Sequence, residues 1–437
     1  MILADFCTGV AYAASAAVWD RSNVRPSKNR GKTGQYHCRT SRDGCSYYVY
    51  VPANYSASNP AGIHVFFHGQ NLQGGAGDFS PWAACFLDRY NLIGINMEYS
   101  DGDNSRDTNG KALAAEEAIA QVMADYKVIK GRGVICSFAS GGLVHGVLHK
   151  RYGQESRGRP TWPFSHTAIY SSNFLKTASD ALLMSWFVGL GADEWKERVS
   201  PNVGRWFPNA PRLGPELGTT ELKRAQELFA DVESGGCPDV YFRIIRNKGH
   251  ELSQEDVVAS AEAFARSDIA FAPFIYAPDF AERELVPVVL LANSHAYGKA
   301  DELLGKVALG ARGPMRQKVQ ALKALLDTRT EKLVSLAEYL AKRDAVLGSY
   351  YGGLFIRQLA GHPRQRLVFD AVLKMQQRED FRRAIGAFEL FQNQIGNFFE
   401  DGKLSPRMLP VLEQVRQASG DQSLYGKMAA EYLQLKE

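Results

Sequence analysis

The residues with the clearest chemical potential lie between Gly133 and His145, where a short apolar run ends in small residues and an amphipathic run follows. This order predicts a strand, a sharp turn and a helix. The five residues from Ser137 to Gly141 have the shape of a G-x-S-x-G turn, which exposes a nucleophilic side chain above a sheet. Ala139 occupies the central place, and its methyl group has no oxygen with which to attack a substrate.

Three interpretations of this turn follow. In the first, Ala139 stands where a serine would act, so that the chain is a hydrolase that lacks one atom. In the second, the register shifts by one residue and Ser140 is the nucleophile. We favour the first, because the second puts the bulky Phe138 where the strained turn needs a small residue. The third is an ordinary glycine-rich turn without chemistry, and only the rest of the chain can separate it from the others.

A hydrolase of this kind also needs an acid and a base, which should follow the nucleophile in the order acid, histidine. His250 follows the last expected strand directly, at the place where open α/β sheets carry their sites. Asp193 follows a strand and a glycine turn, so it is the preferred acid, with Glu194 and Asp180 as alternatives. A helix dipole also favours acids at a helix start, and this role stays open for Asp193 and Glu194.

Two backbone amides would hold the oxyanion of an acyl-transfer reaction. One is the amide of Ser140, which follows the nucleophile position, and the other is that of Gln70, in a glycine-rich loop that begins at His68. His68 and three large aromatic residues are candidates for the substrate wall, although aromatic residues beside such loops as often serve packing. These three are Trp82, Tyr99 and Trp195.

No cofactor or metal is expected. His145 and His149 lie four residues apart on the helix after the turn, but this helix lacks the glutamate of a zinc-binding H-E-x-x-H motif, so core or surface histidines are expected. Residues 101–105 begin like a calcium loop. Arg106 stands where that loop requires glycine, and Ala112 where it requires a bidentate glutamate, so we reject calcium.

Strands and helices that could position these residues alternate from residue 46 to residue 270. Strands are expected at residues 47–51, 63–67, 92–97, 133–138, 167–170, 182–188 and 240–246, and helices at 81–90, 111–126, 220–232 and 254–265. Ser253 and Asp256 form a capping-box pattern before the last of these helices. Such alternation predicts parallel pairing, and therefore an α/β three-layer sandwich with a mostly parallel sheet.

From residue 271 to residue 437 the pattern is helical, and we expect a separate all-helical C-terminal domain of antiparallel pairs that serves packing or self-association. A solenoid is an alternative, although no repeat period can be assigned. The expected helices are residues 286–307, 315–340, 344–359, 364–377, 380–399 and 408–418. Residues 1–45 are expected to be an N-terminal arm or a residual signal segment, because residues 11–17 are small and apolar.

The composition excludes some classes of partner. A formal net charge of +4 without a basic run does not predict a nucleic-acid surface, and no run is apolar enough to span a bilayer. Cys38 and Cys45 flank a turn and could close a small disulfide loop, whereas two free thiols are the alternative. The apolar segment near the start and this cysteine pair favour a secreted or periplasmic protein.

These motifs, in this order, resemble those of the α/β-hydrolase superfamily. Residues 45–267 look most like the branch of polyhydroxyalkanoate depolymerases and feruloyl or acetylxylan esterases. The likeness is carried by His68-Gly69, the turn around Ala139, Gly249-His250, Tyr50-Val51-Pro52 and Ser80-Pro81-Trp82. The chain departs from the family at Ser137, where glycine is usual, and at Ala139, where the family has its serine.

The resemblance implies a serine carboxylic-ester hydrolase with a triad of position 139, Asp193 and His250, acting on an ester that is polymeric or carbohydrate-linked in part of the branch. Because removal of such a nucleophile costs on the order of 10⁶-fold in kcat, the form with Ala139 would bind substrate without turning it over. A catalytically silent hydrolase fold that serves as a binding or scaffold protein is the alternative, as is an esterase that uses Ser140.

Overall fold

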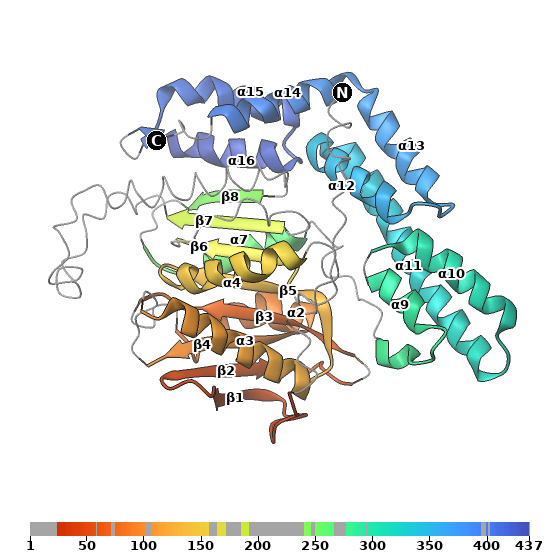
Figure 1. Cartoon of the computed structure of the whole chain (residues 1–437). Helices are drawn as coiled ribbons and strands as arrows, with labels where there is room; N and C mark the ends of the chain where they lie inside the picture. Colours follow the sequence, from red (N-terminus) through yellow and green to blue (C-terminus); the bar gives the residue numbers. More distant parts are fainter. Residues whose placement is uncertain are drawn as a thin grey trace.

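The computed structural model describes residues 24–57, 59–70, 75–100, 106–156, 164–171, 185–191, 240–245, 250–265, 277–293, 295–394, 399–400 and 403–436. Two parts of the chain are distinguished below. The sheet region comprises the described residues up to 265, and the helical region comprises those from 277 onward. In Figure 1 the helices of the helical region lie along one side and across one end of the sheet region.

Among the described residues of the sheet region, eight strands form one sheet in the order β1-β2-β4-β3-β5-β6-β7-β8. The strands are β1 (Gly34–Arg39), β2 (Cys45–Val51), β3 (Ala61–Phe67), β4 (Leu92–Tyr99), β5 (Val128–Phe138), β6 (His166–Tyr170), β7 (Ser185–Gly191) and β8 (Val240–Ile245). All pairs from β4 and β3 through to β8 are parallel, while β2 is antiparallel to both β1 and β4. The predicted, mostly parallel α/β-hydrolase sheet is confirmed.

Helices cover both faces of this sheet (Figure 1). On one face, α3 (Thr108–Asp125) and α4 (Gly141–Ser156) pack on each other and on strands β2 to β5. On the other face, α7 (Gln254–Ala265) packs on β6 and β7. Every residue of β3 and of β6 is buried, as expected of parallel strands covered on both sides. The three-layer sandwich is therefore confirmed.

Two expectations for the sheet region need correction. The predicted N-terminal arm to residue 45 is wrong at its end, because β1 pairs along its whole length with β2. This edge strand is mostly exposed, and its alternation is limited to Tyr36 and Cys38, which is too short a pattern to have revealed it. The predicted helix at 81–90 is three short pieces, α1 (Ser80–Trp82), the π-helix η3 (Ala83–Leu87) and α2 (Asp88–Tyr90).

The predicted capping box at the start of α7 is present. The Ser253 hydroxyl accepts a hydrogen bond from the Asp256 amide at 3.3 Å, and the Asp256 carboxylate accepts one from the Ser253 amide at 2.9 Å. These bonds satisfy two backbone donors that a helix start leaves unpaired. Because α7 begins four residues after His250, its cap also defines the path of the chain just beyond the candidate base.

The helical region contains α9 (Val286–Asn293), α10 (Tyr297–Gly310), α11 (Pro314–Arg343), α12 (Ala345–Gln358), α13 (Gln365–Gln376), α14 (Glu379–Gln394), α15 (Leu409–Ser419) and α16 (Leu424–Leu433). Consecutive helices pack on one another. The predicted helical character of this region is confirmed, and the region also contains a short antiparallel hairpin of β9 (Phe399–Glu400) and β10 (Lys403–Leu404). The expected helix 286–307 is two helices, with His295 in a left-handed conformation between them.

The helix α16, which the sequence did not predict, covers β8 at the edge of the sheet. The Tyr241 hydroxyl donates a hydrogen bond to the Glu431 carboxylate, and the Arg243 Nε lies 3.8 Å from the other oxygen of that carboxylate. An uncovered edge strand offers unpaired backbone groups to other chains. The helical region therefore protects this edge of the sheet.

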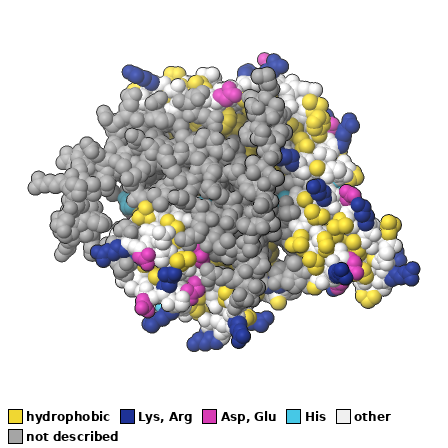
Figure 2. All heavy atoms as spheres, in the orientation of Figure 1, with side chains coloured by type: hydrophobic (Ala, Val, Ile, Leu, Met, Phe, Trp, Pro, Cys, Tyr) yellow, Lys and Arg dark blue, Asp and Glu magenta, His cyan; other side chains and the backbone are white. Residues whose placement is uncertain are grey.

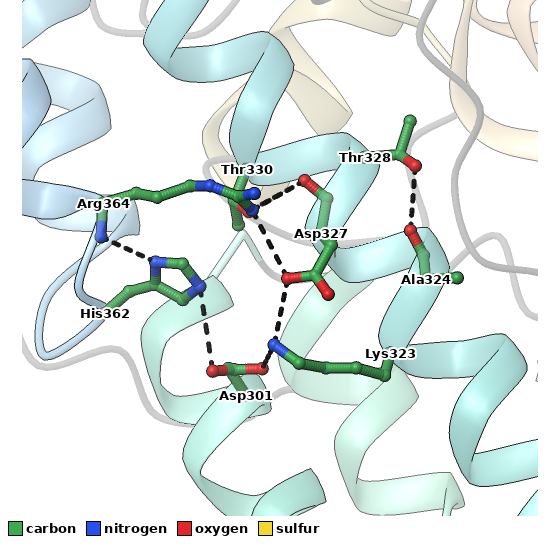
Figure 3. A network of polar contacts seen from close by, with 8 residues as sticks. All are labelled: Asp301, Lys323, Ala324, Asp327, Thr328, Thr330, His362 and Arg364. Carbon is green, nitrogen blue, oxygen red and sulfur yellow. Dashed lines mark hydrogen bonds and ion pairs between the residues drawn. The ribbon is translucent and has the colours of Figure 1, made fainter.

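A network of charged side chains joins three segments of the helical region (Figure 3). The Lys323 ammonium lies 2.7 Å from the Asp301 carboxylate and 2.9 Å from that of Asp327. The His362 Nε2 lies 3.7 Å from Asp301, while its Nδ1 accepts a hydrogen bond of 3.1 Å from the backbone amide of Arg364. The network thus connects α10, α11 and the chain between α12 and α13.

Three sequence expectations concern the surface and the thiols. Within the described part of the chain, no helix combines the length and the apolar character that a membrane crossing requires. Cys38 and Cys45 are free thiols, because Cys38 lies opposite Tyr47 in the β1–β2 hairpin. Figure 2 shows apolar and basic side chains beside one another over the helical region, where Leu309 is 91% exposed.

Candidate active site

The turn between β5 and α4 has the strained backbone of a nucleophile elbow. Ala139 has a φ of 47°, in the left-handed region that residues other than glycine rarely adopt. Such a conformation costs on the order of 1–3 kcal/mol and tends to occur at functional sites. The Ala139 amide donates a hydrogen bond of 3.2 Å to the Tyr170 carbonyl, so the elbow continues the pairing of β5 with β6. Ala139 itself is 5% exposed.

The residues two before and two after Ala139 explain how the turn fits. A Cβ on Gly141 would lie 2.3 Å from the Phe67 carbonyl oxygen, so the start of α4 needs glycine to sit against the end of β3. Ser137 stands where the esterases that the sequence resembles usually have glycine. Its hydroxyl is 3.0 Å from the His145 Nδ1, and both side chains are fully buried. The departure at Ser137 is therefore accommodated by a hydrogen-bonded partner one helix turn into α4.

The two predicted oxyanion donors belong to residues that touch. The Ser140 hydroxyl donates a hydrogen bond of 3.3 Å to the Gln70 side-chain carbonyl, which brings the loop after β3 onto the elbow. This bond joins Ser140 to the residues that follow β3, and the alternative in which Ser140 is the nucleophile stays a prediction.

His68 orients the peptide group that carries the Gln70 amide. Its Nδ1 lies 2.6 Å from the Gly69 carbonyl oxygen and must be the donor, because a carbonyl oxygen has no proton to give. The described chain has no cis peptide bond, so the N–H of Gln70 points away from this carbonyl. His68 is completely buried. It therefore holds the peptide group between Gly69 and Gln70 in place, and its full burial favours this structural role over the predicted place in the substrate wall.

Two of the aromatic residues predicted for the substrate wall lie in the core. Trp82 is fully buried, with its ring centroid 4.9 Å from those of both His64 and Phe66. Tyr99 is also fully buried, 5.4 Å from the His68 ring. This burial favours the packing alternative for both residues. Trp195 lies outside the described residues.

His250 lies beside the elbow strand. Its ring centroid is 5.2 Å from that of Phe138, the last residue of β5, and the side chain is half-buried. Two segments more than 100 residues apart in the sequence therefore meet where the site was predicted. The candidate acids Asp193, Glu194 and Asp180 lie outside the described residues.

The histidines of α4 are core residues. His149 Nε2 lies 2.9 Å from the Thr167 hydroxyl, and the His145 and His149 ring centroids are 5.3 Å apart. Burial lowers the pKa of His149 to about 3 and that of His145 well below its usual value, so both rings are neutral. Among the described residues no cluster of three metal-binding side chains occurs. These positions match the core alternative of the sequence analysis.

Sequence reasoning missed one strained residue next to the elbow. Ser171 has a φ of 46° and is 1% exposed. It follows β6, which is the neighbour of β5 in the sheet, and its amide donates to the Gly189 carbonyl at 2.8 Å. The neighbouring strand ends β5 and β6 thus each lead into a left-handed residue. No pattern of residue types predicts this conformation for a serine.

Comparisons with known proteins give distant structural likenesses. No family model matches the chain, and no curated protein sequence does. The chain is similar to a thermostable esterase, with 14% identity over 55% of this chain and 62% of that one and a TM-score of 0.35. It is similar to the siderophore hydrolase EstA from Aspergillus nidulans, with 13% identity over 60% of this chain and 100% of that one and a TM-score of 0.37.

A third likeness is to the acetyl xylan esterase from Aspergillus awamori, with 12% identity over 53% of this chain and 99% of that one and a TM-score of 0.33. At such identities and scores these likenesses carry no conclusion about activity. The assignment to the α/β-hydrolase fold is based on the strand order and pairing described above.

Proposed function

We propose that the chain has the architecture of a serine carboxylic-ester hydrolase, and that in the form with Ala139 it binds an ester without forming an acyl intermediate. A serine at position 139 would attack the ester carbonyl. His250 would take the proton and return it to the leaving alcohol, and Asp193 would orient the imidazole. The amides of Gln70 and Ser140 would hold the oxyanion. Polymeric and carbohydrate-linked esters are the candidate substrates.

The left-handed conformation of Ala139 is the observation that supports this proposal most strongly. An alanine gains nothing from φ of 47°, whereas a nucleophile needs it to stand above the sheet. The contact of Ser140 with Gln70 and the place of His250 beside Phe138 add the expected neighbours. An ordinary glycine-rich turn would require none of the three.

The substitution Ala139→Ser tests the proposal. We expect nitrophenyl or feruloyl esters to be hydrolysed by this variant at a rate several orders of magnitude above that of the native chain, because nucleophile loss typically costs on the order of 10⁶-fold. Folding is checked by circular dichroism. A folded Ala139→Ser protein with no activity would favour the scaffold alternative, and activity of the native chain that Ser140→Ala abolishes would place the nucleophile at Ser140.

The scaffold alternative has one observation in its favour. Exposed apolar side chains on α10 and α13 lie beside basic residues in the helical region (Figure 2). They include Leu309, Leu367 and Phe369, of which the last two are half-exposed. Faces of this kind often bind a partner or a second copy of the chain. A concentration-dependent mass in analytical ultracentrifugation that Phe369→Ser abolishes would support self-association.

A further inference from the structure

The Gln70 carboxamide forms a hydrogen bond through its oxygen, but its nitrogen forms none with the residues that the structure describes. Its carbonyl oxygen Oε1 accepts the 3.3 Å hydrogen bond from the Ser140 hydroxyl. Its Nε2 carries two N–H donors, and no residue that the structure describes accepts a hydrogen bond from them. Gln70 is partly buried and forms a hydrogen bond with Ser140 of the elbow. The residue thus presents two donors beside the candidate oxyanion site.

The Ser140 bond limits where these donors can lie. A carboxamide is planar, so fixing its oxygen and its stem also fixes the directions of its two N–H bonds. The same residue supplies the backbone amide that is the candidate oxyanion donor, and His68 orients that peptide from below. The donors of Nε2 are therefore held close to Ser140, whose backbone amide is the other candidate oxyanion donor. They are not needed for the oxyanion, which has the amides of Gln70 and Ser140.

We propose that the Gln70 side chain recognises an oxygen on the acyl carbon next to the scissile carbonyl, so that the site selects esters of 2-alkoxy and 2-hydroxy acids over those of plain alkanoic acids. This inference rests on the proposed ester site. A plain acyl chain would bury the Nε2 donors without an acceptor, and a 2-oxygen would satisfy one of them. A neutral hydrogen bond of this kind corresponds to about a threefold to tenfold preference.

A binding experiment on the native chain tests the inference without any catalysis. The probes are 2-methoxy-N-phenylacetamide and N-phenylbutanamide, which have the same length and differ by one oxygen in place of a methylene. We expect calorimetry to give about threefold to tenfold tighter binding of the methoxy amide. Gln70→Met should abolish this preference, and Ser140→Ala should reduce it. Gln254→Met, at the start of α7, is the matched control and should keep it.

Three results would overturn the inference: equal binding of the two amides, a preference that persists in folded Gln70→Met, or no binding of either amide by the native chain. The ester assay separates this from the proposed function. In one outcome, the Ala139→Ser variant hydrolyses nitrophenyl butyrate and nitrophenyl methoxyacetate at rates whose ratio equals that for hydrolysis by hydroxide. That result would contradict the selectivity for a 2-oxygen and would leave the proposed esterase architecture intact. If the amide preference is found but Ala139→Ser is inactive, the catalytic proposal fails and the recognition stands.

Discussion

The sheet region and the helical region satisfy their polar groups in different ways. In the sheet region, four histidines are fully buried, neutral and paired with hydroxyl or thiol groups, as in the contacts of His145 with Ser137 and of His64 with Cys136. In the helical region, the network around Asp301 and Lys323 is charged, and both side chains keep contact with solvent. Buried neutral groups hold fixed positions but do not tolerate protonation, whereas exposed ion pairs contribute little and depend on salt.

The difference follows from the backbone conformation that the sheet region must stabilise at the elbow. The elbow at Ala139 needs a rigid frame, because its left-handed backbone persists only where the surroundings over-determine it. The glycine contact at Gly141 and the buried pairs beneath the elbow provide such a frame. Among the described residues of the helical region, His295 between α9 and α10 is the one residue other than glycine with a left-handed backbone. The predictions below test this contrast, from the largest expected effect to the smallest.

Acidification should destabilise the sheet region more than the helical region, where burial lowers the pKa of His295 alone to about 3 among the described histidines and lowers that of His362 less. Burial lowers the pKa of His64, His149 and His166 to about 3, and that of His145 well below its usual value. These rings are neutral when folded and take up protons when unfolded below about pH 6.5. Stability is therefore full above pH 6.5 and is lost toward pH 3, by about 1.4 kcal/mol per histidine per pH unit.

Two optical signals can follow the two regions separately. All six tryptophans lie before residue 271, so their fluorescence reports only on the first part of the chain, whereas far-ultraviolet circular dichroism also reports on the helices from α9 to α16. We expect the fluorescence midpoint in urea to fall steeply between pH 7 and pH 5. A midpoint that stays constant over this range would contradict the assignment of neutral buried histidines.

Adding one methyl group should have opposite effects in the two regions. Gly141→Ala places a Cβ 2.3 Å from the Phe67 carbonyl oxygen, which should lower the free energy of unfolding by about 1–3 kcal/mol. Gly386→Ala, within α14, places a Cβ in open space and should raise it by about 0.5–1 kcal/mol. Urea titration measures both. A Gly141→Ala protein as stable as the native chain would mean that the start of α4 does not pack closely against the end of β3.

Removing the hydroxyl of the Ser137–His145 pair should have a smaller effect. Ser137→Ala deletes a fully buried hydrogen bond of 3.0 Å, so we expect a loss of about 1–2 kcal/mol in the free energy of unfolding at pH 7. Ser140→Ala is the control, since its partly buried bond to Gln70 should contribute less. Equal losses for the two variants would contradict the special role of the buried pair.

The charged network of the helical region should show the smallest effect. Asp301→Asn removes the ion pair with Lys323, whose side chain is 45% exposed, so we expect a loss of less than about 1 kcal/mol. The loss should shrink further in 0.5 M salt, because salt screens exposed charges. A loss of several kcal/mol that salt does not change would show that this network is as rigid as the buried pairs.

The sequence allowed the framework of the site to be predicted, but not how the framework is held. Periodicity located the strands, and local motifs located the elbow at Ala139 and the capping box of Ser253 and Asp256. The edge strand β1 was missed because its inward face carries only Tyr36 and Cys38 among polar and exposed residues. The partners of His145 and His68 were missed because they depend on a turn angle and on packing between segments, and residue types do not encode these directly.

The most direct test of the whole account is where a serine-directed reagent reacts. The Ala139→Ser variant is treated with a fluorophosphonate, and the adduct is mapped by peptide mass spectrometry. The controls are the native chain and the double variant that combines Ala139→Ser with His250→Ala. The account predicts one adduct, on the serine introduced at position 139, that the native chain lacks and that the loss of His250 suppresses. An adduct on Ser140, or no adduct on a folded Ala139→Ser protein, would contradict it.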